Sequence, residues 1–222
     1  MQLRDRSDGG RRLAAVLAGA ELDDPLVLAL PRGGVPVALE VAVALGAPLD
    51  VIVARKVGAP SHQEYGIGAI AEGGSVVVDR EAVAALGISR DAFDGMVEDE
   101  RRELERRVQR YRGARPLPSV TGRDVVVVDD GLATGVTAEA ALRALRPHQP
   151  RRLVLAVPVC APDTADRLRG LADEVACVDA PTPFQAVGRF YERFDQTSDE
   201  EVLDLLAQAE TRTGITTPSR SS

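Results

Sequence analysis

The segment 124–128, with the sequence DVVVV, limits the possible folds more than any other part of the chain. Four consecutive valines favour a strand buried on both faces, because a strand with one exposed face would alternate apolar and polar residues. The run ends at Asp129-Asp130-Gly131, and apolar residues then recur at helical spacing over residues 136–145. The sequence therefore predicts a strand, a short polar loop and a helix, the repeating unit of a parallel sheet.

Similar apolar runs precede and follow this unit. They predict strands over residues 26–30, 49–54, 153–157 and 174–178, and helices over residues 12–20, 35–45 and 163–171. This alternation predicts an α/β fold with a doubly wound, mostly parallel sheet flanked by helices, which binds ligands at the carboxyl ends of its strands. Because 222 residues are near the upper end for one compact core, we expect residues 1–210 to form a single domain.

Three segments depart from the alternation. Residues 57–74 are rich in glycine, alanine and polar residues, which predicts a long loop or a short hairpin, a mobile lid rather than part of the core. Residues 90–112 combine apolar positions near helical spacing with many charged residues, and they predict a long helix with a solvated face. Residues 211–222 (TRTGITTPSRSS) are expected to form a disordered tail.

The composition argues against two classes of partner. A formal net charge of −7 disfavours nucleic acid, because neutralising phosphates needs an excess of lysine and arginine. No stretch approaches the roughly 18 consecutive apolar residues of a membrane helix. The two cysteines, Cys160 and Cys177, lack metal-ligand spacing and are expected to be buried apolar thiols. We therefore expect a cytoplasmic protein that binds neither nucleic acid nor membrane.

The loop after residues 124–128 carries groups suited to binding a sugar phosphate. Backbone N–H groups at a helix N-terminus bind anions, and threonine hydroxyls can add donors. The expected phosphate cradle consists of Ala133, Thr134, Gly135, Val136 and Thr137. Asp129 and Asp130 would repel a phosphate, but carboxylates accept well from vicinal sugar hydroxyls. The pattern is thus complementary to a ribose 5-phosphate; the alternative is an Asp-Gly turn followed by an N-capping threonine.

The run VVVVDDGLATGVT over residues 125–137 resembles the signature of the type I phosphoribosyltransferases, an apolar strand, two acidic residues and a loop ending in Thr-Gly-x-Thr. The resemblance implies that Asp129 and Asp130 hold the ribose hydroxyls of 5-phosphoribosyl-1-pyrophosphate (PRPP), and that the loop holds its 5′-phosphate. It also implies a pyrophosphate loop at residues 30–34 (LPRGG), often with a non-proline cis peptide bond. There Gly33 allows close backbone approach to an anion, and Arg32 supplies a fixed positive charge.

Further parts of the site are implied in the same way. Arg55 and Lys56 follow the predicted strand 49–54 and could face the pyrophosphate, with Lys56 the stronger candidate. The implied cofactor is Mg²⁺, held mainly by ligand oxygens and water near Asp129 and Asp130, without a direct protein ligand. The implied reaction transfers the phosphoribosyl group of PRPP to a small nitrogenous acceptor and releases pyrophosphate, as in nucleotide salvage.

The acceptor is harder to infer. In family members that act on purines, a hood after the last strand stacks an aromatic ring on the base. Residues about 179–195 match this hood, with Phe184 as the stacking candidate and Val187 beside the base. However, Ala133 stands where enzymes for 6-oxopurines carry an aspartate, and residues 174–178 contain no lysine to bind the base oxygen. These departures put purine specificity in doubt, and Phe184 could equally belong to the core of a small lobe.

Two other functions use the same features. A non-catalytic sensor of PRPP or a nucleotide would need the same binding site, because a fold does not fix an activity. A phosphohydrolase would also need a way to admit and activate water, whereas a long lid favours excluding it. The expected lid contains His62, Gln63, Glu64 and Tyr65. The sequence identifies no general acid or base, and the family resemblance implies a possible homodimer.

Overall fold

The structure, a computed structural model, describes residues 2–60 and 62–215, without the side chains of Gln63 and Glu64. Its centre is a five-stranded parallel sheet with the order β2-β1-β6-β7-β8. The strands are β1 (Leu26–Ala29), β2 (Leu49–Val51), β6 (Asp124–Val128), β7 (Arg152–Val159) and β8 (Glu174–Asp179). Because β1 and β6 are neighbours, the loops that follow these two strands lie side by side although they are about a hundred residues apart in the sequence.

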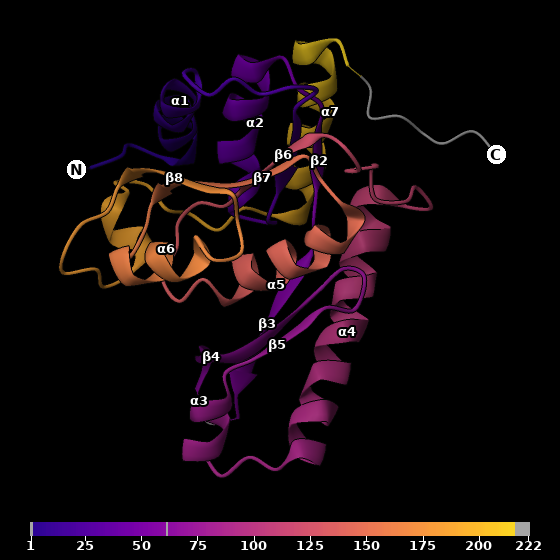
Figure 1. Ribbon diagram of the computed structural model, residues 1–222, viewed down its shortest axis with the longest axis vertical. Helices are drawn as coiled ribbons and strands as arrows, with labels where there is room; N and C mark the ends of the chain where they lie inside the picture. Colours follow the sequence, from indigo (N-terminus) through magenta and orange to yellow (C-terminus); the bar gives the residue numbers. More distant parts are fainter. Residues whose placement is uncertain (1, 61, 216–222) are drawn as a thin grey trace.

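Helices cover both faces of this sheet (Figure 1). One face carries α1 (Arg6–Leu17), α2 (Gly34–Leu45) and α7 (Asp199–Thr213), and the other carries α5 (Val136–Leu145) and α6 (Pro162–Leu168). Alternate residues of β6 pack into the two layers, with Val126 and Val128 in one core and Val125 and Val127 in the other. The predicted fold class, a parallel sheet flanked by helices, is confirmed.

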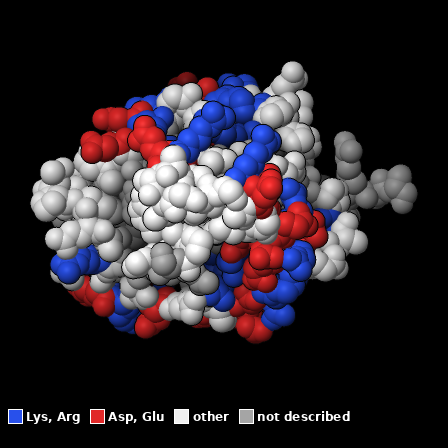
Figure 2. Space-filling view, turned by 90° about the horizontal axis from the view of Figure 1, so that it is seen from below, with Lys and Arg blue, Asp and Glu red and all other residues white. Residues whose placement is uncertain are grey.

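A second, antiparallel sheet projects from this body as an arm (Figure 1). Its elements are β3 (Ala54–Ala59), β4 (His62–Ala71), β5 (Val76–Val78), α3 (Arg80–Ala85) and α4 (Arg90–Arg112). Seen from the end of the arm, acidic and basic side chains are mixed on the side where α4 lies (Figure 2). This mixture agrees with the solvated face predicted for residues 90–112.

The arm corrects the prediction that residues 57–74 lie outside the core. Ile67, Ala69 and Ile70 are almost completely buried in β4. Glycines alternate with these residues because the strand packs closely, so that a Cβ at Gly68 would lie 2.6 Å from the carbonyl oxygen of Val77. The glycine content therefore indicated close packing as well as turns. Exposed residues lie near the two ends of β4, with His62 and Tyr65 at one end and Gly73 and Gly74 after the other.

Other boundaries also differ from the predictions. The predicted helix 12–20 is α1, which begins at Arg6 because the Asp5 side chain accepts a hydrogen bond from the backbone N–H of Asp8. The Gly9-Gly10 pair lies inside the helix, where a Cβ at Gly10 would lie 2.5 Å from the Val37 carbonyl oxygen. The predicted strand 49–54 divides into β2 and β3, which belong to different sheets.

The helix α7 was not predicted from the sequence. This helix starts with a capping box in which Ser198 and Glu201 each accept from the other's backbone N–H. It buries Val202 and Ala209 in the core. Because α7 ends at Thr213, the tail predicted from residue 211 is wrong for its first three residues, and residues 216–222 lie outside the described part of the chain.

Candidate functional site

The two adjacent acids lie at the carboxyl end of β6, near the middle of the parallel sheet. The backbone N–H of Asp130 donates to Oδ1 of Asp129 at 2.8 Å. Nε of Arg6 donates to Oδ2 of Asp130, also at 2.8 Å. The hydroxyl of Tyr191 donates to the main-chain oxygen of Asp130 at 2.7 Å. Among the residues that the structure describes, these contacts use one oxygen of each carboxylate, Oδ1 of Asp129 and Oδ2 of Asp130.

The surroundings disfavour ionisation of both acids at once. Burial raises the pKa of Asp129 well above its ordinary value, and the neighbouring Asp130 raises it further. Burial also raises the pKa of Asp130, but the Arg6 guanidinium opposes this effect through its charge and its hydrogen bond. Two hydroxyl donors from a sugar would stabilise the charged carboxylates in the same way.

The loop after β1 lies directly against these acids. A Cβ at Gly33 would lie 2.1 Å from Oδ2 of Asp130, and a Cβ at Gly34 would lie 2.6 Å from the carbonyl oxygen of Val128. The Pro31–Arg32 peptide bond is cis. Nη1 of Arg32 lies 3.7 Å from Oδ1 of Asp199, at the start of α7. The structure thus brings the LPRGG loop and the acid pair together, as the strand order requires.

The loop between β6 and α5 is held by its carbonyl groups. The carbonyl oxygen of Leu132 accepts from the N–H of Ala161, that of Ala133 from the Thr164 hydroxyl, and that of Thr134 from Nη2 of Arg167. In a trans peptide the following N–H points opposite to the carbonyl, so the N–H groups of residues 133–135 face away from α6. Together with the first N–H groups of α5, they form a set of donors suited to an anion.

The glycine in this loop has a defined role. Gly135 adopts a left-handed conformation with φ of 70° immediately before α5. A Cβ there would also lie 2.6 Å from a side-chain carbon of Thr164. Gly135 therefore allows both the turn and the close approach of α6. The side chain of Thr134 is exposed in this loop, and that of Thr137 is half-exposed in the first turn of α5.

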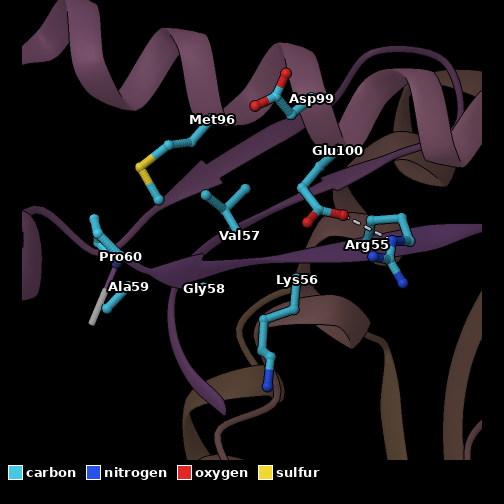
Figure 3. Close-up of a pocket in the computed structure, with 9 residues that line it drawn as sticks. All are labelled: Arg55, Lys56, Val57, Gly58, Ala59, Pro60, Met96, Asp99 and Glu100. Atoms are coloured by element: carbon cyan, nitrogen blue, oxygen red, sulfur yellow. Dashed lines mark hydrogen bonds and ion pairs between the residues drawn. The ribbon is translucent and has the colours of Figure 1, made fainter. Parts of the chain in front are cut away.

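Lys56 reaches this region from the arm. It lies in β3, where Arg55 and Lys56 point to opposite sides of the strand (Figure 3). Nε of Arg55 is 2.8 Å from Oε2 of Glu100 on α4, beside a cavity of about 400 Å³. A Cβ at Gly66 would lie 3.0 Å from the Lys56 side chain and 3.3 Å from Val136, the first residue of α5 and part of the predicted cradle. The stem of Lys56 therefore lies close to the predicted cradle, whereas Arg55 belongs to the β3–α4 contact.

The hood combines residues 184–194 with Leu3 near the N-terminus. Residues 184–194 pack over the end of the sheet, and Leu3 pairs with Tyr191 in a parallel bridge. The rings of Phe184 and Phe190 stack with centroids 5.1 Å apart. Val187 lies over Gly131, directly after the acid pair. Both predicted acceptor residues thus lie in the hood, packed among its apolar side chains.

Four residues of this region were not identified from the sequence: Arg6, Thr164, Arg167 and Tyr191. Each contacts the site from a distant part of the chain; the contact between Arg6 and Asp130, for example, spans 124 residues. No local sequence pattern marks such a contact.

Cys160 is buried and Cys177 half-buried, both as free thiols, and a hydrogen bond from Cys177 lowers the pKa of Cys160.

Two further properties bear on cofactors and location. Among the residues that the structure describes, no group of three or more histidine, cysteine or acidic side chains is arranged to hold a metal ion. None of the helices in residues 2–60 and 62–215 combines the length and apolar character needed to cross a bilayer.

Comparison with known proteins places the chain in a family. The model of the phosphoribosyl transferase domain matches residues 2–191. A Mycobacterium tuberculosis H37Rv protein named "Putative phosphoribosyl transferase" is 47% identical over 205 residues, which are 92% of this chain and 46% of that protein. The chain thus spans about half the length of this curated relative. The crystal structure of TT1426 from Thermus thermophilus is 44% identical, with a TM-score of 0.78 over 94% of this chain and 99% of that one. The chain therefore belongs to the phosphoribosyl transferase domain family, as its resemblance to the type I phosphoribosyltransferases predicted.

Proposed function

We propose that this chain is a Mg²⁺-dependent phosphoribosyltransferase that transfers the phosphoribosyl group of PRPP to a small nitrogenous base and releases pyrophosphate. The observation that carries the proposal is the contact between the LPRGG loop and the acid pair, next to the N–H donors of the following loop. Three neighbouring sites, one for hydroxyls and two for anions, match the three parts of PRPP. Family membership and the 47% identical relative support the same reaction class.

The residues divide by the part of PRPP that they would bind. Asp129 and Asp130 would accept from the ribose hydroxyls through their remaining oxygens. The backbone from Ala133 to Thr137, with the threonine hydroxyls, would bind the 5′-phosphate. Arg32 and Gly33 would bind the pyrophosphate, with Lys56 adding a positive charge from the arm side.

Arg32 would have to exchange partners to bind the pyrophosphate, because it lies beside Asp199. Asp199 would remain compensated, since it accepts a hydrogen bond from the Tyr111 hydroxyl and lies 3.5 Å from Arg110. We expect Arg32→Ala to weaken binding of pyrophosphate at least tenfold and binding of ribose 5-phosphate by less than threefold. Equal effects on the two ligands would contradict the assignment of Arg32.

Mg²⁺ fits the chemistry of these donors as an ion bound chiefly through the ligand. The acid pair supplies only two carboxylates, which is too few to surround a Mg²⁺ ion with protein ligands alone. Mg²⁺ commonly retains several waters and binds substrate phosphates instead. When bound, it would neutralise and orient the pyrophosphate. The protein's part is to hold the sugar between the acids and the phosphate loop. Its carboxylates then stabilise the positive charge that develops at ribose C1, and Arg32 stabilises the departing anion.

The acceptor would bind between the acid pair and the hood. Phe184 is the candidate to stack on the base and Val187 to lie beside it, since both belong to the hood and Val187 contacts Gly131. We infer a nitrogenous base, with purines among the candidates, and assign no residue as general acid or base. We also propose that the protein is cytoplasmic and that it forms a homodimer.

The decisive experiment measures pyrophosphate release by purified protein given PRPP, Mg²⁺ and one acceptor at a time from a panel of purines, pyrimidines and nitrogenous acids. Release that depends on one acceptor would support the transferase. Tight PRPP binding without turnover on the whole panel would favour a sensor, and release without any acceptor would favour a hydrolase. The double variant Asp129→Asn, Asp130→Asn is the control, since it should lose PRPP binding and remain folded.

A further inference from the structure

Arg6 connects the acid pair to the hood. It is the first residue of α1, and its side chain is only 12% exposed. Besides its contact with Asp130, Nη1 donates to the carbonyl oxygen of Asp195 at 2.6 Å. Its guanidinium carbon lies 3.9 Å from the centroid of the Phe194 ring. The Arg6 side chain thus contacts both Asp130, a candidate for binding the ribose, and the C-terminal part of the hood.

These contacts form a closed ring. Phe194 stacks on Tyr191, with centroids 5.0 Å apart and an interplanar angle of 24°. The Tyr191 hydroxyl then donates to the main-chain oxygen of Asp130, the residue whose side chain Arg6 binds. Asp130 is therefore held twice, by its carboxylate through Arg6 and by its carbonyl through Tyr191.

We propose that Arg6 is a positioning residue for the ribose site, which holds the Asp130 carboxylate charged and oriented toward the sugar and ties its position to the hood. The role rests on the proposed function, because it requires that Asp130 accept from a ribose hydroxyl. Arg6 itself would not touch the reacting atoms.

The geometry indicates that Arg6 can hold the Asp130 carboxylate without occupying the oxygens proposed to bind the sugar. Arg6 binds Oδ2 of Asp130, and the Asp130 N–H occupies Oδ1 of Asp129, so that Oδ1 of Asp130 and Oδ2 of Asp129 are available to adjacent hydroxyls. The groups facing the pair differ by element. Arg6 brings a positive charge, Tyr191 a hydroxyl directed to the main chain, and the β1–α2 loop the uncharged Gly33.

Arg32, the nearest charged residue of the β1–α2 loop, is engaged with Asp199. Arg6 is therefore the residue whose positive charge opposes the effect of burial on the Asp130 carboxylate before the ligand binds. Removing its charge should make Asp130 a poorer acceptor for the sugar while leaving the phosphate loop intact.

The test compares ribose 5-phosphate with 2-deoxyribose 5-phosphate, which lacks one of the two hydroxyls. Dissociation constants for both ligands are measured by calorimetry in the wild type, Arg6→Gln and Arg6→Lys. Arg193→Gln is the matched control, because Arg193 lies in the same hood and pairs with Asp5 instead of Asp130. The measured ratio is the dissociation constant of 2-deoxyribose 5-phosphate divided by that of ribose 5-phosphate. We expect Arg6→Gln to reduce this ratio at least fivefold and Arg6→Lys to restore most of it. Arg193→Gln should leave the ratio unchanged.

The pH dependence provides a second readout. Without Arg6 the pKa of Asp130 rises, so ribose 5-phosphate affinity should begin to fall at a higher pH in Arg6→Gln than in the wild type. The acids, Tyr191 and the ligand phosphate are the same in both proteins, so the difference between the two curves reports on Arg6. Coincident curves would overturn the proposal.

The outcomes separate this inference from the proposed function. A wild-type ratio near one would overturn the ribose assignment and the role of Arg6 with it. A large wild-type ratio that Arg6→Gln leaves unchanged, with both ligands weakened equally, would overturn only the role of Arg6. If Arg6→Gln fails to fold, Phe194→Leu removes the ring contact and keeps the charge; a ratio reduced about twofold or more would support the connection to the hood, and an unchanged ratio would overturn it.

Discussion

A Cβ on Gly33 would lie 2.1 Å from Oδ2 of Asp130, the oxygen that accepts the hydrogen bond from Arg6. Real Cβ atoms do not approach other atoms so closely, so any side chain at this position must displace the carboxylate or the loop. Gly33 thus couples two parts of the candidate site, the loop assigned to pyrophosphate and the acid assigned to ribose. The absence of a side chain serves close packing here, since Gly33 has an ordinary φ of −60°.

Gly33→Ala should therefore impair the ribose site specifically. The added methyl group would push the Asp130 carboxylate away from Arg6, and we expect PRPP affinity to fall at least tenfold in calorimetric titrations. Gly19→Ala is the control, because a Cβ there would meet nothing within 4 Å. Unchanged PRPP affinity in Gly33→Ala would show that Asp130 can move without loss and would argue against its assignment.

The phosphate loop depends on α6 for its orientation. Arg167 donates through Nη2 to the carbonyl oxygen of Thr134 and pairs with Glu139. Arg167→Ala should free this carbonyl and loosen the N–H donors, weakening inorganic phosphate and ribose 5-phosphate about three- to tenfold. Arg169→Ala is the matched control, because Arg169 lies at the end of the same helix and pairs with exposed Asp166. Similar losses of affinity in both variants would mean that the effect comes from removing a positive charge near the site and not from the contact with Thr134.

Lys56 and its neighbour Arg55 allow a similar comparison. Because they point to opposite sides of β3, removing each charge should have different consequences (Figure 3). Lys56→Ala should weaken PRPP binding tenfold or more, whereas Arg55→Ala should cost at most about 1 kcal/mol of stability, as for partly exposed ion pairs, and leave affinity within twofold. Titration calorimetry and thermal unfolding distinguish these results, and equal PRPP affinities in the two variants would exclude a role for Lys56.

Local patterns predicted the parts of this fold that depend on local causes. The boundaries of α4, β6 and α5 agree with the predicted segments 90–112, 124–128 and 136–145. In β6 and α5 a single local pattern is enough to predict the element. Four valines favour a buried strand, and Gly135 marks the start of the helix. The acid pair and the LPRGG loop were also located, because strand ends are visible in the sequence.

The errors arise where distant contacts override local composition. The glycines of residues 57–74 suggested a loop or a short hairpin outside the core; the hairpin exists, but Gly68 in β4 is required by the close approach of Val77 and Phe93 in a buried strand. The capping box of Ser198 and Glu201 is a local pattern that indicates the start of α7, although this helix was not predicted. Arg6 offered no signal at all, since its role depends on an acid 124 residues away.

The acid pair should lower the stability of the ligand-free protein at neutral pH. Its folded pKa values are raised, so the folded state binds protons that the unfolded chain, with aspartate pKa values near about 3.9, has already lost. Stability of the wild type should therefore fall as pH rises from that value through the raised folded pKa values. Below the unfolded pKa both states are protonated and the penalty disappears.

Asp129→Asn tests this penalty, because an amide oxygen can still accept from the Asp130 N–H but carries no charge. At pH 7 to 8 we expect its Tm to exceed that of the wild type by a few degrees, since about 1 kcal/mol corresponds to roughly 2–4 °C in a domain of this size. The gain should shrink toward zero as the pH falls to about 4. Asp204→Asn, an exposed position on α7, is the control and should show no such trend. A variant less stable than the wild type at pH 7 would mean that the Asp129 charge stabilises the empty site, contrary to its burial beside Asp130.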